Sequence, residues 1–434
     1  NQELLIEKFN NIDKALVEKN NSQIARKLGL NWIEYAANPI SKADMQVLNH
    51  EINKKKKHKP MRVLIKEIPD LLQTAKPCWM MSPLSVSQLI ESDNSNVEFD
   101  LVIFDEASQI RTEDAICSIY RAKQLILAGD SNQLPPTNFF NYINEDDDYE
   151  NSSFESVLDE CAVFLDSKTL NWHYRSRHED LIKFSNHYIY DNQLITFPSP
   201  IAKSAAYGVD FEMVEDGYYE KGSRFNRKEA QRVAEAILDH YSNNPETSLG
   251  VIAFSEAQQF AIERELGKAL RADMQLQEKM QKHMDDELTN SLFIKNLENV
   301  QGDERDVIFF SIGYARDKKG SLSHNFGPLN REGGHRRLNV AVTRARNKLK
   351  VFSSITSVDI DLSRTSAQGA TLLKKYLAFA ETCSGSLAKD AQDEVTDLVT
   401  ESQLLLLQKE KRNPYANKDY FGIEESIARS LEAE

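Results

Sequence analysis

The chain of 434 residues lacks the features that would place it in a membrane or outside the cell. No run of about 18 apolar residues occurs, so no membrane-spanning helix is predicted. The polar start at residues 1–11 carries no signal-peptide pattern, and a first residue other than methionine indicates an internal cut or a processed end. The four cysteines are far apart without a CxxC pair, so neither a zinc site nor a disulfide framework is predicted. A reducing cytoplasm is the expected location.

Positive charge is also in deficit, because the chain has 53 lysines and arginines but 67 aspartates and glutamates, which gives a net charge of −14. This balance favours solubility and does not exclude nucleic acid, since a protein that tracks a strand needs only a local positive channel. The main basic run covers residues 54–59 and ends at Pro60. It is either a solvated loop, which we favour, or a phosphate contact beside a nucleic-acid channel.

Short apolar runs alternate with helical stretches from residue 61 onward. Apolar runs at residues 101–104, 124–128, 251–254 and 307–311 are typical of buried strands, and the stretch 256–270 is typical of a helix. Strand and helix in alternation predict parallel sheets covered by helices. The expected organisation is a helical segment at 1–60, α/β domains at 61–170 and 171–357, and a linker with carboxy-terminal helices at 358–434.

Two adjacent carboxylates, Asp105 and Glu106, follow the apolar strand in the segment VIFDEASQ. In a nucleotide-hydrolysing site one carboxylate holds hydrated magnesium and a second activates the attacking water. An acidic pair alone is weak evidence, because it is usually a solvated strand end. The next segment, LILAGDSNQLPPT, contains a glycine and two prolines that shape a loop. It also contains Gln133, whose side-chain amide can sense a phosphate.

Arginines stand in two further segments. LNWHYRS presents Arg175, whose planar donor fork suits phosphate oxygens, and RRLNVAVTRAR at residues 336–346 is predicted to be a helix that carries Arg344. Such an arginine can neutralise charge in a phosphoryl-transfer transition state. The segment ENVQGDERD precedes another predicted strand.

In the order DEASQ, GDSNQLPPT, HYRS, ENVQGDERD and RRLNVAVTRAR, these segments resemble motifs II to VI of superfamily 1 helicases, and the branch is similar to the up-frameshift-like, 5′ to 3′ helicases. The resemblance covers residues 75–355. It implies two RecA-like lobes, of which the first is incomplete, with ATP and Mg²⁺ between them and single-stranded nucleic acid across them. The roles it implies are Asp105 on Mg²⁺, Glu106 on water, Gln133 on the γ-phosphate, Arg175 and Arg344 on phosphate charge, Glu304 on the ribose, Gly302 beside the nucleotide, and Ser82, Pro135, Pro136, Thr137 and Gln301 on the strand.

Two further segments, at residues 76–88 and 369–381, are similar to large bacterial helicases that carry a Vsr-like nuclease domain. Residues 421–431 resemble the first helix of that nuclease domain, although an ordinary terminal helix is the alternative. This resemblance implies DNA rather than RNA as the substrate.

The phosphate loop of the family, G-x-x-x-x-G-K-[ST], is absent, because Gly29 is the only glycine before Gly129. One explanation is a partial helicase that is inactive alone and needs an amino-terminal portion carrying the loop. The other is a non-catalytic module that binds nucleic acid or serves as a scaffold. We favour the first, because the catalytic carboxylates remain. We also expect an incomplete sheet in the first lobe, with the gap filled by a helix from residues 1–60, a second copy, or residues outside this sequence.

Overall fold

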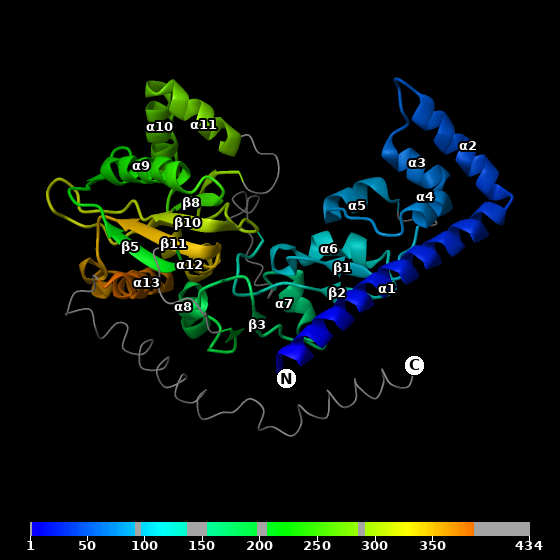
Figure 1. The fold of residues 1–434 in the computed structure, drawn as a ribbon, viewed down its shortest axis with the longest axis horizontal. Coiled ribbons are helices and arrows are strands. Elements are labelled where there is room, and N and C mark those ends of the chain that lie inside the picture. Colours follow the sequence, from blue (N-terminus) through cyan, green and yellow to red (C-terminus); the bar gives the residue numbers. More distant parts are fainter. Residues whose placement is uncertain (1, 92–96, 137–153, 198–205, 285–290, 386–434) are drawn as a thin grey trace, which may run out of the picture. The chain divides into compact units, whose positions relative to one another are not determined.

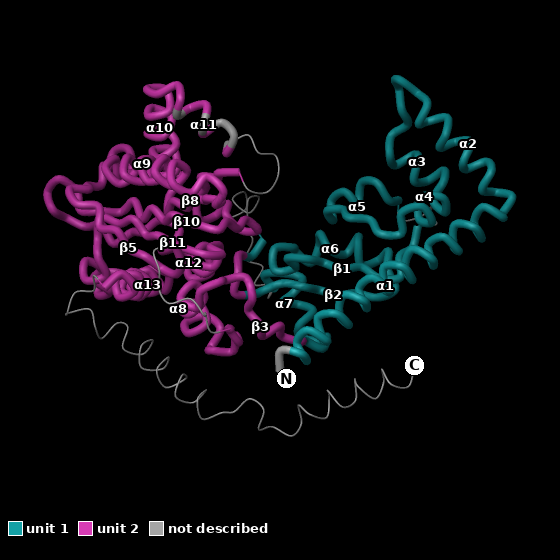
Figure 2. Tube along the Cα trace, viewed as in Figure 1, with its two compact units in different colours: residues 1–131, 135–167 teal, residues 132–134, 168–434 magenta. Residues whose placement is uncertain are grey.

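The structure, a computed structural model, describes residues 2–91, 97–136, 154–197, 206–284 and 291–385. The chain divides into two compact units, shown in different colours in Figure 2. Unit 1 comprises residues 1–131 and 135–167, and unit 2 comprises residues 132–134 and 168–434. The short segment 132–134 therefore belongs to unit 2 although both its neighbours belong to unit 1. The predicted helices after residue 392 lie outside the described residues.

Unit 1 is mostly helical in its first half, as the sequence predicts for residues 1–60. Its helices and strands are α1 (Gln2–Ala37), α2 (Ile40–Asn53), α3 (Met61–Glu67), α4 (Pro69–Ala75), α5 (Pro83–Leu89), β1 (Val102–Phe104), the 3-10 turn η1 (Ala107–Gln109), α6 (Thr112–Ile119), β2 (Leu125–Leu127) and α7 (Val157–Cys161).

The sheet of unit 1 contains two described strands, β1 and β2, which pair in parallel. Phe104 faces a small core with residues of η1, α6 and α7. Ile103 and Ile126, which are paired across the two strands, are 61% and 50% exposed. Parallel strands are normally covered on both faces, so this face lacks a layer among the described residues. The expectation of an incomplete first sheet is confirmed for the described residues, and α1 does not bury these two side chains.

Unit 2 is built around one larger sheet. Its helices and strands are β3 (Trp172–His173), α8 (Asp180–Tyr188), β4 (Ile195–Thr196), β5 (Gly208–Met213), β6 (Tyr219–Glu220), β7 (Phe225–Asn226), α9 (Arg227–Asn243), β8 (Leu249–Ala253), α10 (Glu256–Ala272), α11 (Met274–Met284), β9 (Phe293–Asn296), β10 (Arg305–Ser311), η3 (Gly327–Asn330), α12 (Gly334–Val342), β11 (Ala345–Ser353), η4 (Ser357–Asp359), η5 (Leu362–Arg364) and α13 (Gln368–Ser384).

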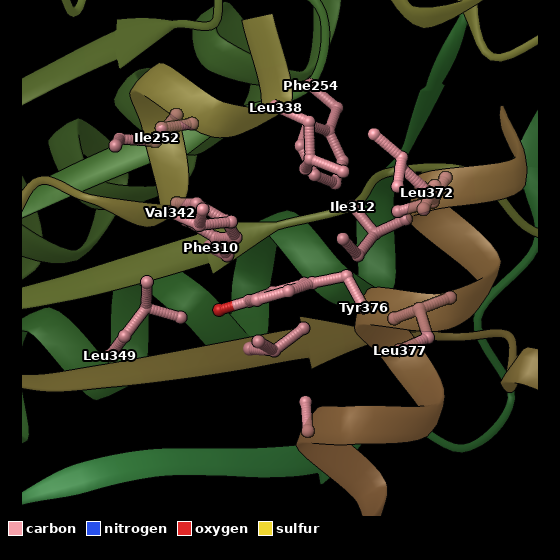
Figure 3. Close-up of a cluster of buried hydrophobic side chains, with 14 of the residues drawn as sticks. Ile252, Phe254, Phe310, Ile312, Leu338, Val342, Leu349, Leu372, Tyr376 and Leu377 are labelled. Carbon is pink, nitrogen blue, oxygen red and sulfur yellow. The ribbon is translucent and has the colours of Figure 1, made fainter. Parts of the chain in front are cut away.

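Five parallel strands form this sheet in the order β5-β11-β10-β8-β9. Successive residues of β10 face opposite layers, because Phe309 packs with α9 and α10 whereas Phe310 packs with α12 and α13. The second layer is seen in Figure 3, where Phe310 and Tyr376 lie in one buried cluster. Helices on both sides of the sheet (Figure 1) confirm the predicted α/β fold with a parallel sheet.

Two details of unit 2 differ from the sequence-based expectation. The helix predicted for residues 336–346 ends at Val342, and Ala345 begins β11. The hydroxyl of Thr343 donates to the carbonyls of Asn339 and Val340, and Arg344 Nε also donates to Val340, so side chains replace the next helical amides. Within the segment 358–434, predicted as a linker with carboxy-terminal helices, α13 lies in the core of unit 2.

Candidate functional site

The paired carboxylates predicted to serve catalysis follow β1 in unit 1. Asp105 is exposed and Glu106 is half-buried. Glu106 has φ 53°, a left-handed conformation that is uncommon outside glycine, asparagine and aspartate. Its amide donates to Asp105 Oδ1 at 3.0 Å, and Gln109 Nε2 donates to its Oε2 at 3.3 Å. The two neighbouring carboxylates thus follow the end of one strand, with the backbone of Glu106 in a left-handed turn.

Gly129 brings the loop after β2 against this turn. A Cβ atom at position 129 would lie 3.1 Å from the amide nitrogen of Ala107 and 3.0 Å from that of Ser108. The amide of Ala107 also donates to the carbonyl of Ala128 at 2.9 Å. A Cβ here would also lie 2.9 Å from Leu158 Cδ2, so the absence of a side chain at Gly129 accommodates the close approach of this loop to the turn after Glu106. The carboxyl ends of parallel strands are where α/β sheets bind ligands.

In unit 2, the structure brings Arg175, Glu304 and Arg346 together. Arg175 Nε lies 2.8 Å from Glu304 Oε2, and Arg346 Nη2 hydrogen-bonds the other carboxylate oxygen. The hydrogen bond from Arg346, with the charges of Arg175, Arg346 and Arg344, lowers the pKa of Glu304 despite partial burial. The side chain of Arg175 is 40% exposed. The donor fork of Arg175 is thus oriented by Glu304 and still accessible.

Arg344, the predicted transition-state arginine, is only 3% exposed. Its Nε donates to the carbonyl of Val340 at 2.7 Å, and its Nη2 donates to the hydroxyl of Thr343 at 3.0 Å. Its charge acts on Glu304 together with those of Arg175 and Arg346. Sequence analysis overlooked Arg346, which is 38% exposed in its side chain. Arg346 stands in the same TRAR string as Arg344. The two arginines differ because Arg344 precedes β11, whereas Arg346 lies in that strand, which begins at Ala345.

The segment 132–134, which contains Gln133, is held within unit 2. Asn339 Nδ2 on α12 donates to the carbonyl of Asn132 at 3.0 Å and to the hydroxyl of Tyr190 at 2.9 Å. Leu134 packs against the large core cluster of unit 2. Helix α12, which precedes Arg344 in the sequence, therefore hydrogen-bonds Asn132, the residue next to Gln133. Asn339 is 2% exposed and was not singled out from the sequence.

The residues predicted to contact nucleic acid are spread over several segments. Ser82 caps α5 by accepting from the amide of Ser85 at 3.2 Å, whereas Pro135 and Pro136 are half-buried. Thr137 lies outside the described residues. Gly302 has φ 86° with nothing within 4 Å of a Cβ built there, and Gln301 beside it is half-buried. Ser82, Pro135 and Pro136 thus belong to unit 1, whereas Gln301 and Gly302 belong to unit 2.

Two general properties bear on cofactors and location. Among the residues that the structure describes, no group of three or more His, Cys, Asp or Glu side chains could hold a metal ion. Magnesium in nucleotide sites usually takes one or two carboxylates together with phosphates and waters, so a single exposed carboxylate such as Asp105 fits it. None of the described helices combines the length and apolar character that a membrane span requires.

Known proteins resemble this chain over most of its length. Residues 80–140 and 149–356 match two family models that are both described as an AAA domain. The chain is 35% identical over 338 residues to an uncharacterised ATP-dependent helicase of Mycoplasma genitalium, covering 75% of this chain and 29% of the relative. It is 26% identical over 379 residues to DNA polymerase alpha-associated DNA helicase A of Saccharomyces cerevisiae, covering 79% of this chain and 49% of that protein.

A solved structure of arterivirus nonstructural protein 10, a helicase with DNA, is similar at 14% identity and a TM-score of 0.29 over 61% of this chain and 41% of that one. The helicase sen1 of Schizosaccharomyces pombe is 26% identical over 287 residues, covering 62% of this chain and 15% of the relative. The chain thus spans under a third of the Mycoplasma relative's length. Two AAA-domain segments and these relatives identify the chain as a homologue of superfamily 1 ATP-dependent helicases.

Proposed function

We propose that the intact protein is an ATP-dependent helicase or translocase that moves along single-stranded nucleic acid, with DNA favoured over RNA. The observation that supports this best is the cluster around Glu304. Arg175, Glu304 and Arg346 come from three segments that are far apart in the sequence. The sequence of each of these segments resembles a helicase motif. Phosphate recognition gives a physical reason for gathering several arginines around one carboxylate.

In this proposal ATP is hydrolysed between the two lobes of the intact protein. Asp105 would hold Mg²⁺, which neutralises phosphate charge when it is bound. Glu106 orients and deprotonates the attacking water, and Gln133 senses the γ-phosphate. Arg175 and Arg344 stabilise the charge that develops on the transferred phosphoryl group.

The remaining roles concern the nucleoside and the strand. Glu304 contacts the ribose while it keeps Arg175 in place, and Gly302 gives the backbone near the nucleotide its left-handed conformation. Gln301 and the strand-contacting residues Ser82, Pro135, Pro136 and Thr137 are proposed to face the nucleic acid. The closer resemblance to bacterial helicases with a Vsr-like nuclease domain also stays a proposal, since residues 421–431 lie outside the described residues.

This chain alone is proposed to be inactive, because no G-x-x-x-x-G-K-[ST] segment occurs in its sequence. That loop donates several charge-assisted hydrogen bonds to the phosphates, each worth roughly 1.5–3 kcal/mol. An amino-terminal portion of a longer protein would supply the loop. The same portion would cover the exposed face that carries Ile103 and Ile126.

Phosphate release measures the proposal directly. The 434-residue chain and a longer gene product that contains it are assayed at saturating ATP and Mg²⁺, with and without single-stranded DNA. We expect turnover well below about 1 per second for the chain and stimulated turnover of about 1–100 per second for the longer protein. Activity of the chain at enzyme-like rates would overturn the missing-loop account. A longer protein that binds DNA but never hydrolyses ATP would favour the non-catalytic module.

A further inference from the structure

The loop between α2 and α3, residues 54–59, concentrates positive charge in an acidic chain. We call it the basic loop. Lys55, Lys56, Lys57 and His58 are exposed, and none of them forms an ion pair with another described residue. Lys54 and Lys59, at the two ends, instead pair with Glu51 and Glu67. The loop thus separates into paired ends and a middle in which three lysines have no ion-pair partner among the described residues.

The side chain of Glu51 hydrogen-bonds both ends of the basic loop, and we call this pair of contacts the Glu51 clasp. Its Oε1 accepts from Lys54 Nζ, and its Oε2 accepts from the backbone amide of Lys59 at 3.0 Å. The Glu51 side chain is only 7% exposed. The hydrogen bonds from Lys54 and then Lys59 lower the pKa of this carboxyl, so it stays charged at neutral pH. One buried carboxylate therefore fixes both ends of the basic loop.

The backbone of the loop is also specifically shaped. Lys57 has φ 58°, a left-handed conformation that a residue with a long side chain rarely adopts. Pro60, with φ −54°, is then the N-cap residue of α3. Like charges on three consecutive lysines repel each other, and nothing in the core of unit 1 requires them. Strain and repulsion retained on an exposed turn point to a role in binding rather than in folding.

The chemistry of the loop selects its partner. Lysine ammonium groups are compact, mobile point charges that suit phosphate oxygens without reading sequence. The whole chain carries −14, so its overall charge opposes the approach of a polyanion, and binding must depend on a local positive site. An extended phosphate backbone can contact successive lysines of a single turn.

We propose that the basic loop binds the phosphate backbone of single-stranded nucleic acid, through Lys55, Lys56 and Lys57 presented by the Glu51 clasp. The proposal rests on the proposed helicase function for its ligand, and it adds a contact that none of the helicase motifs contains. It takes phosphate contact, rather than a solvated loop, as the role of residues 54–59.

Binding of a fluorescent 30-nucleotide oligodeoxythymidine to the full 434-residue chain tests this contact. Anisotropy titrations between about 20 and 200 mM salt compare wild type with K55A/K56A/K57A. Losing three phosphate contacts on a single strand should lower the slope of log K against log salt by about 2. At low salt the affinity should fall about tenfold, as three exposed ion pairs would give.

A matched control removes the same charge elsewhere in unit 1. Lys8, Lys14 and Lys27 are exposed on α1 and make no ion pair among the described residues. The K8A/K14A/K27A variant should keep the wild-type slope to within about 0.5. Equal losses in both triple variants would mean that net charge alone is responsible, and this would overturn the proposal.

E51Q tests the clasp separately, because it keeps every lysine and removes one negative charge. If presentation matters, the affinity falls severalfold although the net charge has become more favourable. A rise in affinity would overturn the role of the clasp. If wild type binds but K55A/K56A/K57A binds equally well, the loop proposal fails while the helicase function stands. If wild type shows no binding at 20 mM salt, the loop proposal fails as well, since the loop is fully present in this chain.

Discussion

Arg175 Nε and Glu304 Oε2 lie 2.8 Å apart, an ion pair that joins two segments of unit 2 that are distant in sequence. Arg346 binds the other oxygen of the same carboxylate. Glu304 therefore orders two arginines, and neither of them is buried. The functional assignment of Arg175 can be tested against Arg346, which shares its partner and its exposure.

In a longer protein that carries the phosphate loop, R175A should lower kcat of ATP hydrolysis about a hundredfold or more, with a small change in KM. The reason is that a guanidinium on developing phosphate charge acts mainly in the transition state. R346A should lower kcat by less than about tenfold, because Arg346 has no assigned phosphate contact. Steady-state kinetics at saturating DNA distinguish them. Similar losses in the two variants would show that the pair acts through Glu304 rather than on ATP.

The close approach at Gly129 predicts a second result. G129A places a Cβ against the amide nitrogens of Ala107 and Ser108, and backbone atoms cannot yield as a flexible side chain can. Overpacking of this kind costs about 1–3 kcal/mol, so the melting temperature of unit 1 should fall. G222A is the control, because nothing lies within 4 Å of a Cβ at that position. Unchanged thermal unfolding of G129A would show that the turn after Glu106 is not held in this way.

Much of this architecture follows from sequence patterns. The apolar runs at residues 101–104 and 307–311 are strands β1 and β10, and the helix expected at residues 256–270 is α10. Buried parallel strands and amphipathic helices carry strong local signals, which explains these successes. The positions of Asp105 and Glu106 at a strand end could be predicted for the same reason. Their chemical roles remain predictions.

Long-range contacts account for what the sequence did not show. The helical pattern of residues 336–346 continues beyond Val342, but pairing with β10 draws Ala345 into β11. The pairing of Arg175 with Glu304 depends on how distant segments meet, which local periodicity does not encode. The place of residues 132–134 in unit 2 likewise involves distant contacts, from Asn339 of α12 to Asn132 and from Leu134 to the core of that unit.

That side chain gives a third prediction. N339A removes the hydrogen bonds to the carbonyl of Asn132 and the hydroxyl of Tyr190, and so removes one of the contacts that hold the segment next to Gln133. In the longer protein we expect a loss of severalfold or more in the stimulation of ATP hydrolysis by DNA, with a smaller effect on the basal rate. Y190F, which removes only the Tyr190 contact, is the control and should keep the stimulation. If N339A and Y190F lower the stimulation equally, the hydrogen bond to Asn132 does not couple DNA binding to ATP hydrolysis.

Glu229 predicts a dependence on pH. It is fully buried on α9 and accepts from Ser311 Oγ and from the amide of Gly313, both at 2.7 Å. Burial outweighs these hydrogen bonds and raises the pKa of Glu229 from 4.5 to about 7. Folding therefore favours the protonated form. The favourable contribution is complete below about pH 4.5 and is lost as the pH rises through 7.

The unfolding free energy of E229Q relative to wild type should therefore increase from pH 5 to pH 8, by up to about 3 kcal/mol. Amide hydrogen exchange of β10 follows unit 2 specifically. Burial lowers the pKa values of His173 and His240, which opposes this trend at acid pH, but both residues are present in the two proteins and cancel in the difference. A difference that does not vary with pH would mean that Glu229 keeps its ordinary pKa.

The most direct test of the helicase account is E106Q in the longer protein, with nucleotide affinity and turnover measured side by side. Glu106 is assigned to the attacking water and Asp105 to the metal. The E106Q variant should therefore bind ATP with an affinity within about threefold of wild type. It should also lower hydrolysis by at least about a hundredfold, the lower end of the range for general-base catalysis. Wild-type turnover by E106Q, with ATP still bound, would contradict the assignment of these carboxylates and the catalytic site built on them.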